Sequence, residues 1–96
     1  MNEGKAREKI DRANKADALL RNEILQDAFV YLDTQFTDAW KQTPVQDKEA
    51  RENLYLLCQN LSAIKDYIYR VVEDGKLAQS ALDGLQLNRK FDKRNK

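Results

Sequence analysis

The feature that most constrains the fold is a row of apolar residues that recurs at alternating steps of four and three positions. Its members are Ala50, Leu54, Leu57, Leu61, Ile64, Ile68 and Val71. These steps place the side chains on one face of an α-helix, with the seven-residue period of a coiled-coil seam. A half-buried strand would instead alternate at every second residue. The sequence therefore predicts a long helix from about Val45 to Asp74.

A second apolar row predicts another long helix nearer the N-terminus, from about Asp17 to Lys41. The row consists of Leu25, Phe29, Leu32, Phe36 and Trp40, with Ala18, Leu20, Ile24, Ala28 and Tyr31 beside it. Residues 1–16 contain good helix formers but only one large apolar side chain, Ile10. Because such a segment has no large apolar face to bury, we expect it to extend the first helix as a solvated arm.

The link between the two helices, Gln42 to about Gln46, contains the single proline of the chain. Pro44 disfavours helical geometry at Thr43 but suits the first turn of a new helix. Thr43 can act as the N-cap, with Gln46 in the position of a capping box. Asp47 is the alternative cap, which makes the link four residues longer. Two long helices joined by such a tight break pack antiparallel.

Gly75 is the expected end of the second helix, in left-handed geometry. Further apolar residues follow it at helical spacing: Leu77, Ala81, Leu82 and Leu85. They predict a short third helix that stops near Gly84. The expected fold is all-α, an antiparallel helical hairpin of two long helices plus a short C-terminal helix. We divide the chain into a charged arm (1–16), a hairpin domain (17–86) and a basic tail (87–96).

Each long helix carries an apolar band wider than a contact between two helices can cover. Because burial stabilises by roughly 25 cal/mol per Å², we expect the remaining surface to meet another chain. The simplest arrangement is a dimer that forms a four-helix bundle. Docking onto a larger protein assembly and a self-sufficient three-helix monomer are the alternatives. The interface candidates are Phe29, Phe36, Trp40, Tyr55, Leu61, Ile68 and Tyr69. Trp40 is either a plug at the end of the hairpin core or an interface anchor.

The residue types that enzymes use are scarce in this chain. It has no histidine, one cysteine and no glycine-rich phosphate loop, so we expect no catalytic, cofactor-binding or metal-binding residues and no enzymatic activity. Cys58 falls within the apolar rhythm and is predicted to be a small buried side chain. A lone cysteine fits a reducing compartment. No window approaches 18 apolar residues, so no membrane contact is expected.

Charge is unevenly distributed along the chain. Residues 18–75 hold six basic and ten acidic residues, whereas residues 76–96 hold six basic and two acidic ones. The basic tail is the one nucleic-acid-like signal, because cationic side chains bind phosphates without reading sequence. Its candidate residues are Arg89, Lys90, Phe91, Lys93 and Arg94. A solubilising terminus is the alternative interpretation.

Residues 18–80 also resemble a known group of proteins. The matching positions are Leu19, Leu20, Leu25, Ala39, Trp40, Thr43, Pro44, Arg51, Glu52, Gly75, Lys76, Leu77 and Ala78. This pattern is similar to that of small, uncharacterised helical proteins of tailed bacteriophages and prophages. The resemblance implies a phage protein from the virion-assembly or DNA-packaging part of the genome. Together with the wide apolar bands, it leads us to expect a non-enzymatic protein of virion assembly or an oligomeric adaptor, located in the cytoplasm of the bacterial host or in the virion. A DNA-associated packaging or regulatory protein is the alternative.

Overall fold

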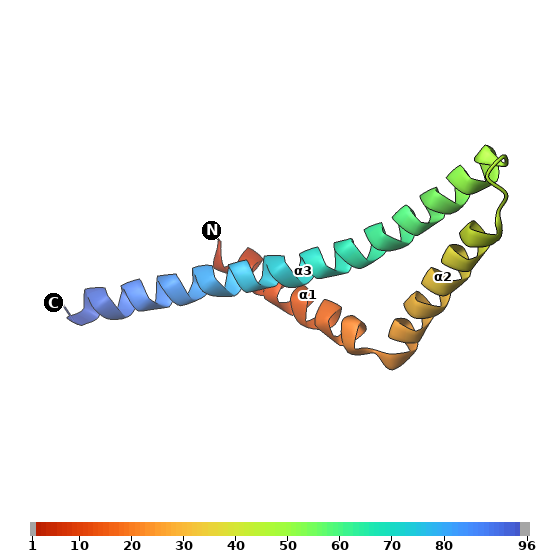
Figure 1. The fold of residues 1–96 in the computed structure, drawn as a ribbon. Coiled ribbons are helices and arrows are strands. Elements are labelled where there is room, and N and C mark those ends of the chain that lie inside the picture. The colour runs from red at the N-terminus through yellow and green to blue at the C-terminus, as the bar shows by residue number, and fades with distance from the viewer. Residues whose placement is uncertain (1, 95–96) are drawn as a thin grey trace. The chain divides into compact units, whose positions relative to one another are not determined.

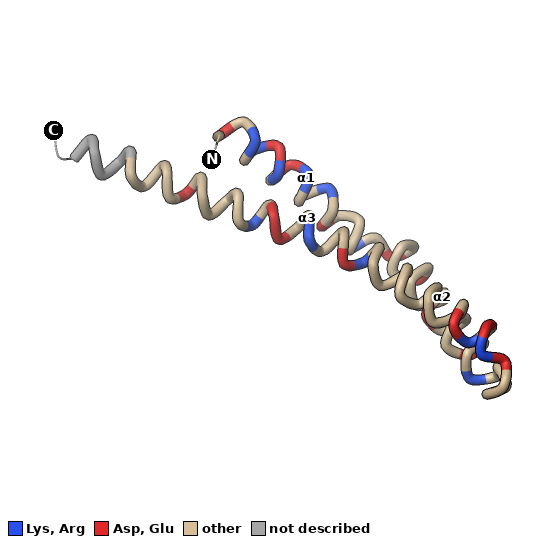
Figure 2. The backbone as a smooth tube through the Cα atoms, turned by 90° about the horizontal axis from the view of Figure 1, so that it is seen from above, with Lys and Arg blue, Asp and Glu red and all other residues tan. Residues whose placement is uncertain are grey.

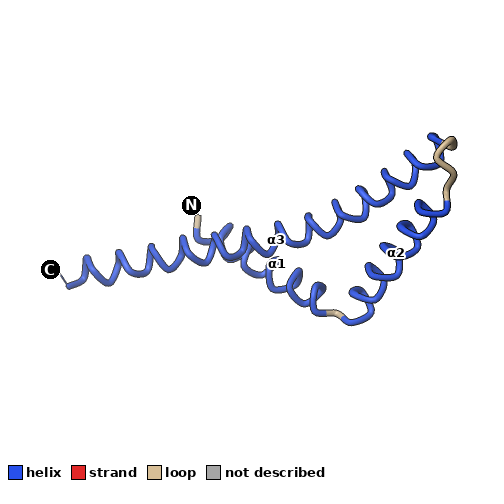
Figure 3. The backbone as a smooth tube through the Cα atoms, viewed as in Figure 1, coloured by secondary structure: helices blue, strands red, loops and turns tan. Residues whose placement is uncertain are grey.

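The computed structural model describes the backbone of residues 2–94 and the side chains of residues 2–88. It contains helix α1 (Glu3–Arg21), helix α2 (Glu23–Gln42) and helix α3 (Lys48–Arg94) (Figures 1 and 3). Within the described residues there is no strand, so the prediction of an all-α chain is confirmed.

The chain forms two compact units. Unit 1 comprises Met1–Ala18 and Ile68–Lys96, and unit 2 comprises Leu19–Tyr67. Helix α3, which is 47 residues long, contributes to both. These units follow from contacts within the folded chain. The division into arm, hairpin domain and tail rests on composition and stays a prediction.

In unit 1, α1 packs against the C-terminal half of α3. Ala6 and Ala78 are completely buried, Leu82 is 6% exposed, and Ile10 and Leu85 are half-buried around them. The expectation of a solvated arm is therefore wrong for this face of α1. Its apolar row is made chiefly of alanines, which include the buried Ala6, Ala13 and Ala16. A search for large apolar side chains overlooks such a row, although small ones let two helices approach closely.

The prediction that a helix ends at Gly75 is also wrong. Helix α3 continues through Gly75 and Gly84, and no glycine in the described part of the chain has a positive φ. The predicted short third helix is therefore a continuation of α3. A Cβ atom added to Gly75 would overlap the Cβ of Ala13 and lie 3.1 Å from the Lys9 carbonyl oxygen. This glycine serves close helix packing, not a turn.

The predicted continuous helix from Asp17 to Lys41 is interrupted at Asn22. The Asn22 backbone is extended, with φ −67° and ψ 118°, and its side-chain oxygen accepts a 2.9 Å hydrogen bond from the Leu25 N–H. Gln26 also donates through Nε2 to the Leu20 carbonyl oxygen at 2.6 Å. Asparagine is a favoured N-cap because its side chain satisfies an N–H group that the helix leaves open. The cap therefore starts α2 as a helix separate from α1.

At the link, the alternative with Asp47 as the cap is confirmed. The Ala50 N–H donates to Asp47 Oδ1 at 3.2 Å, and α3 begins at Lys48 instead of Val45. Thr43 closes the preceding helix: its N–H donates to the Trp40 carbonyl oxygen at 3.2 Å. An aspartate at the N-terminus of a helix is favoured both as a hydrogen-bond acceptor and as a negative charge.

The close approach at Gly75 makes a prediction about stability. We expect Gly75→Ala to destabilise the protein by about 1–3 kcal/mol, because the new methyl group meets Ala13 and the α1 backbone instead of a flexible side chain. Gly84→Ala is the matched control. Nothing lies within 4 Å of a Cβ at Gly84, so helix propensity alone stabilises that variant by up to about 1 kcal/mol.

Urea unfolding followed by circular dichroism measures both effects. Adding Ala13→Gly to Gly75→Ala is expected to recover part of the loss, because it removes the overlapping methyl group. If Gly75→Ala stabilised the protein as much as Gly84→Ala does, the packing of α1 on α3 would be disproved.

Candidate association surface

Unit 2 consists mainly of α2 and the first part of α3, which are joined by the turn at residues 43–47 (Figure 1). Near the turn, the Arg51 guanidinium lies 4.3 Å from the centre of the Trp40 ring and donates to the Thr43 carbonyl oxygen at 3.3 Å. Further along, Lys65 Nζ lies 3.1 Å from Asp33 Oδ2 and 5.3 Å from the centre of the Phe29 ring. These contacts fix which flank of each helix faces the other.

The interior of unit 2 is thin. Among residues 19–67, all of which the structure describes, Leu61 is the only buried residue. No residue of α2 is buried. The other inward side chains are half-buried: Leu25, Phe29 and Phe36 from α2, and Leu54 and Cys58 from α3. Cys58 is thus not the buried side chain that the sequence predicted.

The seven interface candidates are distributed over several environments. Leu61 is buried, Phe29, Phe36 and Ile68 are half-buried, and Trp40, Tyr55 and Tyr69 are 41%, 56% and 57% exposed. Trp40 and Tyr55 line one shallow hollow of about 190 Å³ together with Thr37 and Cys58. Tyr69 belongs to unit 1. The candidates therefore do not form a single surface, and their role at an interface stays a prediction.

The apolar seam of α3 is longer than the sequence suggested. One row continues at every seventh residue through Leu54, Leu61, Ile68, Gly75 and Leu82, and a parallel row through Leu57, Ile64, Val71, Ala78 and Leu85. Both rows lie within the single helix α3. The sequence analysis placed a helix end at Gly75, so it missed the part of each row that follows Gly75.

The second row is covered in unit 1 and bare in unit 2. Ala78 is completely buried and Leu85 half-buried in the cluster with α1. Leu57 and Ile64, one and two heptads before Val71, are 43% and 53% exposed. The same line of α3 that holds a helix in one unit is therefore unoccupied in the other.

Two opposite flanks of the α2–α3 pair can be distinguished. Successive residues of a helix are about 100° apart, which puts Asp33 and Thr37 on one side of the inward line of α2, and Ile24 and Tyr31 on the other. On α3, the same 100° step places Tyr55 on one side of the line that faces α2, and Leu57 and Ile64 on the other side. Because Thr37 and Tyr55 line one hollow, their flanks meet on one side of the pair. The flanks that carry Ile24, Tyr31, Leu57 and Ile64 must then meet on the other side.

Asp38 follows Tyr31 by seven residues on this second side. We call the part of this side that holds no charged residue the uncharged face. It consists of Ile24, Ala28, Tyr31 and Gln35 from α2, and Asn53, Leu57, Asn60, Ile64 and Tyr67 from α3. Ile24 is 75% exposed, and the two tyrosines are 63% and 58% exposed. Residues 53–64 contain no charged residue in a chain that is 34% charged, and Figure 2 shows this part of α3 in tan.

Sequence reasoning did not single out the large residues of this face. Two signals could have found them. Ile24 and Tyr31 stand seven residues apart, as do Leu57 and Ile64, and the twelve-residue stretch 53–64 is free of charge. Instead, the interface candidates were chosen from aromatic positions and from other members of the seam.

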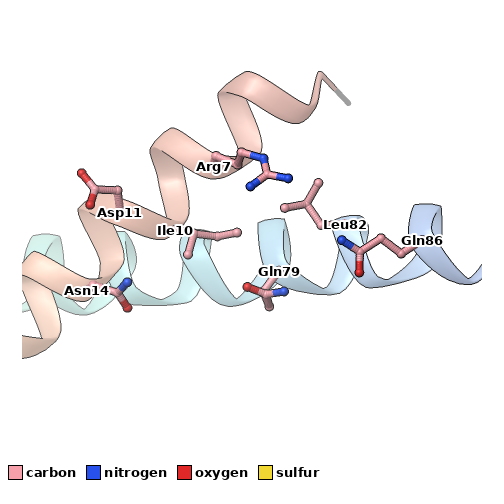
Figure 4. A pocket seen from close by; sticks show the side chains of 7 residues that line it. All are labelled: Arg7, Ile10, Asp11, Asn14, Gln79, Leu82 and Gln86. Atoms are coloured by element: carbon pink, nitrogen blue, oxygen red, sulfur yellow. The ribbon is translucent and has the colours of Figure 1, made fainter.

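Unit 1 carries a different hollow, of about 360 Å³, between α1 and α3. Its lining is Arg7, Ile10, Asp11, Asn14, Gln79, Leu82 and Gln86, and Figure 4 shows these side chains projecting from both helices around it. Gln79 already donates to Asp83 Oδ1 at 2.9 Å. The hollow is open and its polar groups do not converge on one point, so it does not define a ligand.

The structure describes the side chains of residues 2–88, and among these no three His, Cys, Asp or Glu side chains are grouped so that they could hold a metal ion. No helix in this part of the chain is long and apolar enough to cross a membrane. The nucleic-acid candidates Arg89, Lys90, Phe91, Lys93 and Arg94 belong to α3 by their backbone, but their side chains lie outside the described residues.

Comparisons with protein-family models, with curated proteins and with solved structures find no match to this chain.

The contact between Arg51 and Trp40 can be tested by fluorescence, because Trp40 is the single tryptophan. We expect Arg51→Met to destabilise the protein by about 1 kcal/mol, since it removes a cation–π contact and a hydrogen bond from a charged donor. The variant should also shift the Trp40 emission. Arg70→Met, which replaces an exposed arginine of α3, is the control and should leave the emission unchanged. Equal effects of the two variants would contradict the contact.

Proposed function

We propose that this protein is a non-enzymatic helical association protein, an assembly component or adaptor that acts through protein–protein contacts. The observation that carries the proposal is the incomplete interior of unit 2. This unit has one buried residue, Leu61, yet it presents five large side chains on its uncharged face. These are Ile24, Tyr31, Leu57, Ile64 and Tyr67.

The size of the effect supports this proposal. Complete burial of a large apolar side chain is worth about 1.5–3 kcal/mol. Five such side chains, each about half exposed, represent on the order of 5 kcal/mol that a covering surface would add. The whole stability of a folded domain is only about 5–15 kcal/mol. Association therefore offers unit 2 a stabilisation comparable to that of a complete small domain.

The setting of this association is inferred from the sequence. The resemblance of residues 18–80 to small proteins of tailed bacteriophages and prophages supports a role in virion assembly, in the host cytoplasm or in the virion. The α2–α3 pair would serve as the helical hairpin of a larger helical bundle. Its turn carries part of the resemblance, at Trp40, Thr43 and Pro44.

A second candidate function is DNA association in packaging or regulation. Its support is the charge of residues 76–96, which hold six basic and two acidic residues. Because phosphate contacts by lysine and arginine are weakened by salt, a gel shift at low salt is the sensitive assay. If this function is right, the full chain retains DNA and a chain without residues 88–96 does not. DNA retention that is absent throughout, or unchanged by the deletion, would exclude this candidate.

A photo-crosslinking amino acid in the uncharged face tests the association function. A benzophenone side chain at Tyr31, installed in cells that produce the protein, is expected to yield covalent adducts with whatever covers the face. The matched control is the same side chain at Thr34, which is also exposed on α2 but lies on the side of the helix turned away from α3. We expect adducts at Tyr31 and few or none at Thr34. Absence of adducts at Tyr31, or equal yields at both positions, would refute the proposed function.

A further inference from the structure

We propose that residues 3–18 of α1, the part of this helix that belongs to unit 1, form a releasable strap over the C-terminal half of α3. The strap opens while unit 2 stays folded, and its opening lengthens the exposed apolar seam of α3. This regulatory role rests on the proposed association function, whereas the opening itself needs no partner. Four observations support the inference: what the strap covers, how weakly it is held, how α2 begins and the phase of the two helices.

The strap covers the same seam that unit 2 leaves exposed. In the cluster with α1, Ala78 is completely buried, Leu82 is 6% exposed and Leu85 is half-buried. Leu57 and Ile64 stand on the row of Ala78 and Leu85 at the same seven-residue spacing, and both are exposed. Opening of the strap therefore extends one exposed apolar row along α3.

The strap is held by small side chains. Its buried residues are Ala6, Ala13 and Ala16, and its one large apolar residue, Ile10, is half-buried. An alanine buries a single methyl group, so it contributes less to the contact than a leucine or a phenylalanine would. Nine of the 16 residues in the strap carry a charge. The opened strap therefore exposes few apolar groups of its own.

Helix α2 has a beginning that does not depend on the strap. Asn22 Oδ1 accepts the Leu25 N–H at 2.9 Å, and the Gln26 N–H donates to the Asn22 carbonyl oxygen at 3.0 Å. The Asn22 N–H donates to the Leu19 carbonyl oxygen at 3.1 Å, and Gln26 Nε2 donates to that of Leu20 at 2.6 Å. All four bonds lie within unit 2. Because the cap satisfies an N–H group at the start of α2, loss of the strap leaves this helix end intact.

The covered sides of α1 and α2 are out of phase at the break. In α1, the residues that are not exposed follow one another at steps of three and four from Glu3 to Leu20. The next such step reaches Glu23 or Ile24, which are both exposed, whereas the half-buried residue is Leu25, a step of five. One residue corresponds to a rotation of about 100°. The contacts of α1 and of α2 are thus made by two separate helices, which permits one set to open without the other.

Hydrogen exchange of the full chain, followed by mass spectrometry, tests the inference. Ala13→Lys forces a long charged side chain into the close contact with Gly75. We expect the amides of the strap to exchange at least about 100-fold faster than in the wild type, and those of α2 to change by less than about threefold. Ala18→Lys is the matched control, because Ala18 is exposed on the same helix. It should leave both sets of amides unchanged.

A measurement on the wild-type chain guards against a variant that fails to fold. In low concentrations of urea, we expect exchange of the strap amides to depend less steeply on urea than exchange of the α2 amides. The reason is that opening of the strap exposes less surface than unfolding of the whole chain does.

Three results would overturn the inference. If Ala13→Lys accelerated exchange in α2 by the same factor as in the strap, the two units would open together. If it left the strap unchanged, the contact with Gly75 would not hold the strap. Equal urea dependence of both sets in the wild type would show that the strap leaves α3 only when the whole chain unfolds. The benzophenone adducts at Tyr31 test the proposed function separately from all three.

Discussion

The rest of the structure depends on the apolar seam of α3. Its two rows run from Leu54 to Leu85 without a charged residue in either. A single helix cannot bury both apolar rows by itself, and isolated helices gain little stability from propensity alone. Each part of α3 therefore needs a neighbouring helix. The folded chain supplies α1 to the C-terminal part and α2 to the N-terminal part.

The two neighbours meet this need in different ways. In unit 1 the contact is made by small residues, with Gly75 against Ala13 and Ala6 near Ala78, so the helix backbones come close and the seam is buried. In unit 2 the contact is made by large side chains such as Phe29 and Phe36, which stay half-buried. Large side chains hold the helices further apart, and α2 then covers only one of the two rows. Unit 1 thus buries its seam within the chain, whereas unit 2 leaves Leu57 and Ile64 exposed.

This contrast leaves unit 2 with an exposed apolar surface that unit 1 lacks along the same row of α3. Its ion pair and its cation–π contacts lie on one flank and join α2 to α3. The other flank carries the uncharged face, where Ile24, Leu57 and Ile64 are 75%, 43% and 53% exposed. An exposed apolar surface of this kind is the basis of the proposed association function.

Much of the local structure could be predicted from the sequence. The periodicity of α2 and α3 was visible, as were the all-α class, the tight turn at Pro44 and the Asp47 cap as one of two alternatives. The break at Asn22 was missed because the apolar pattern continues across it, although asparagine is a favoured cap. The helical path through Gly75 was missed for a different reason. A glycine looks the same in sequence whether it ends a helix or admits a neighbouring one.

Sequence by itself therefore determined the all-α class and which positions on α2 and α3 are apolar, because both follow from the period of the chain. Only the tertiary structure decided which of those positions are covered. The buried alanines of α1, the role of Gly75 and the exposure of Leu57 and Ile64 all depend on how closely a second helix approaches. Side chains that are far apart in the sequence set this distance between the helices. The periodicity of one helix carries no information about it.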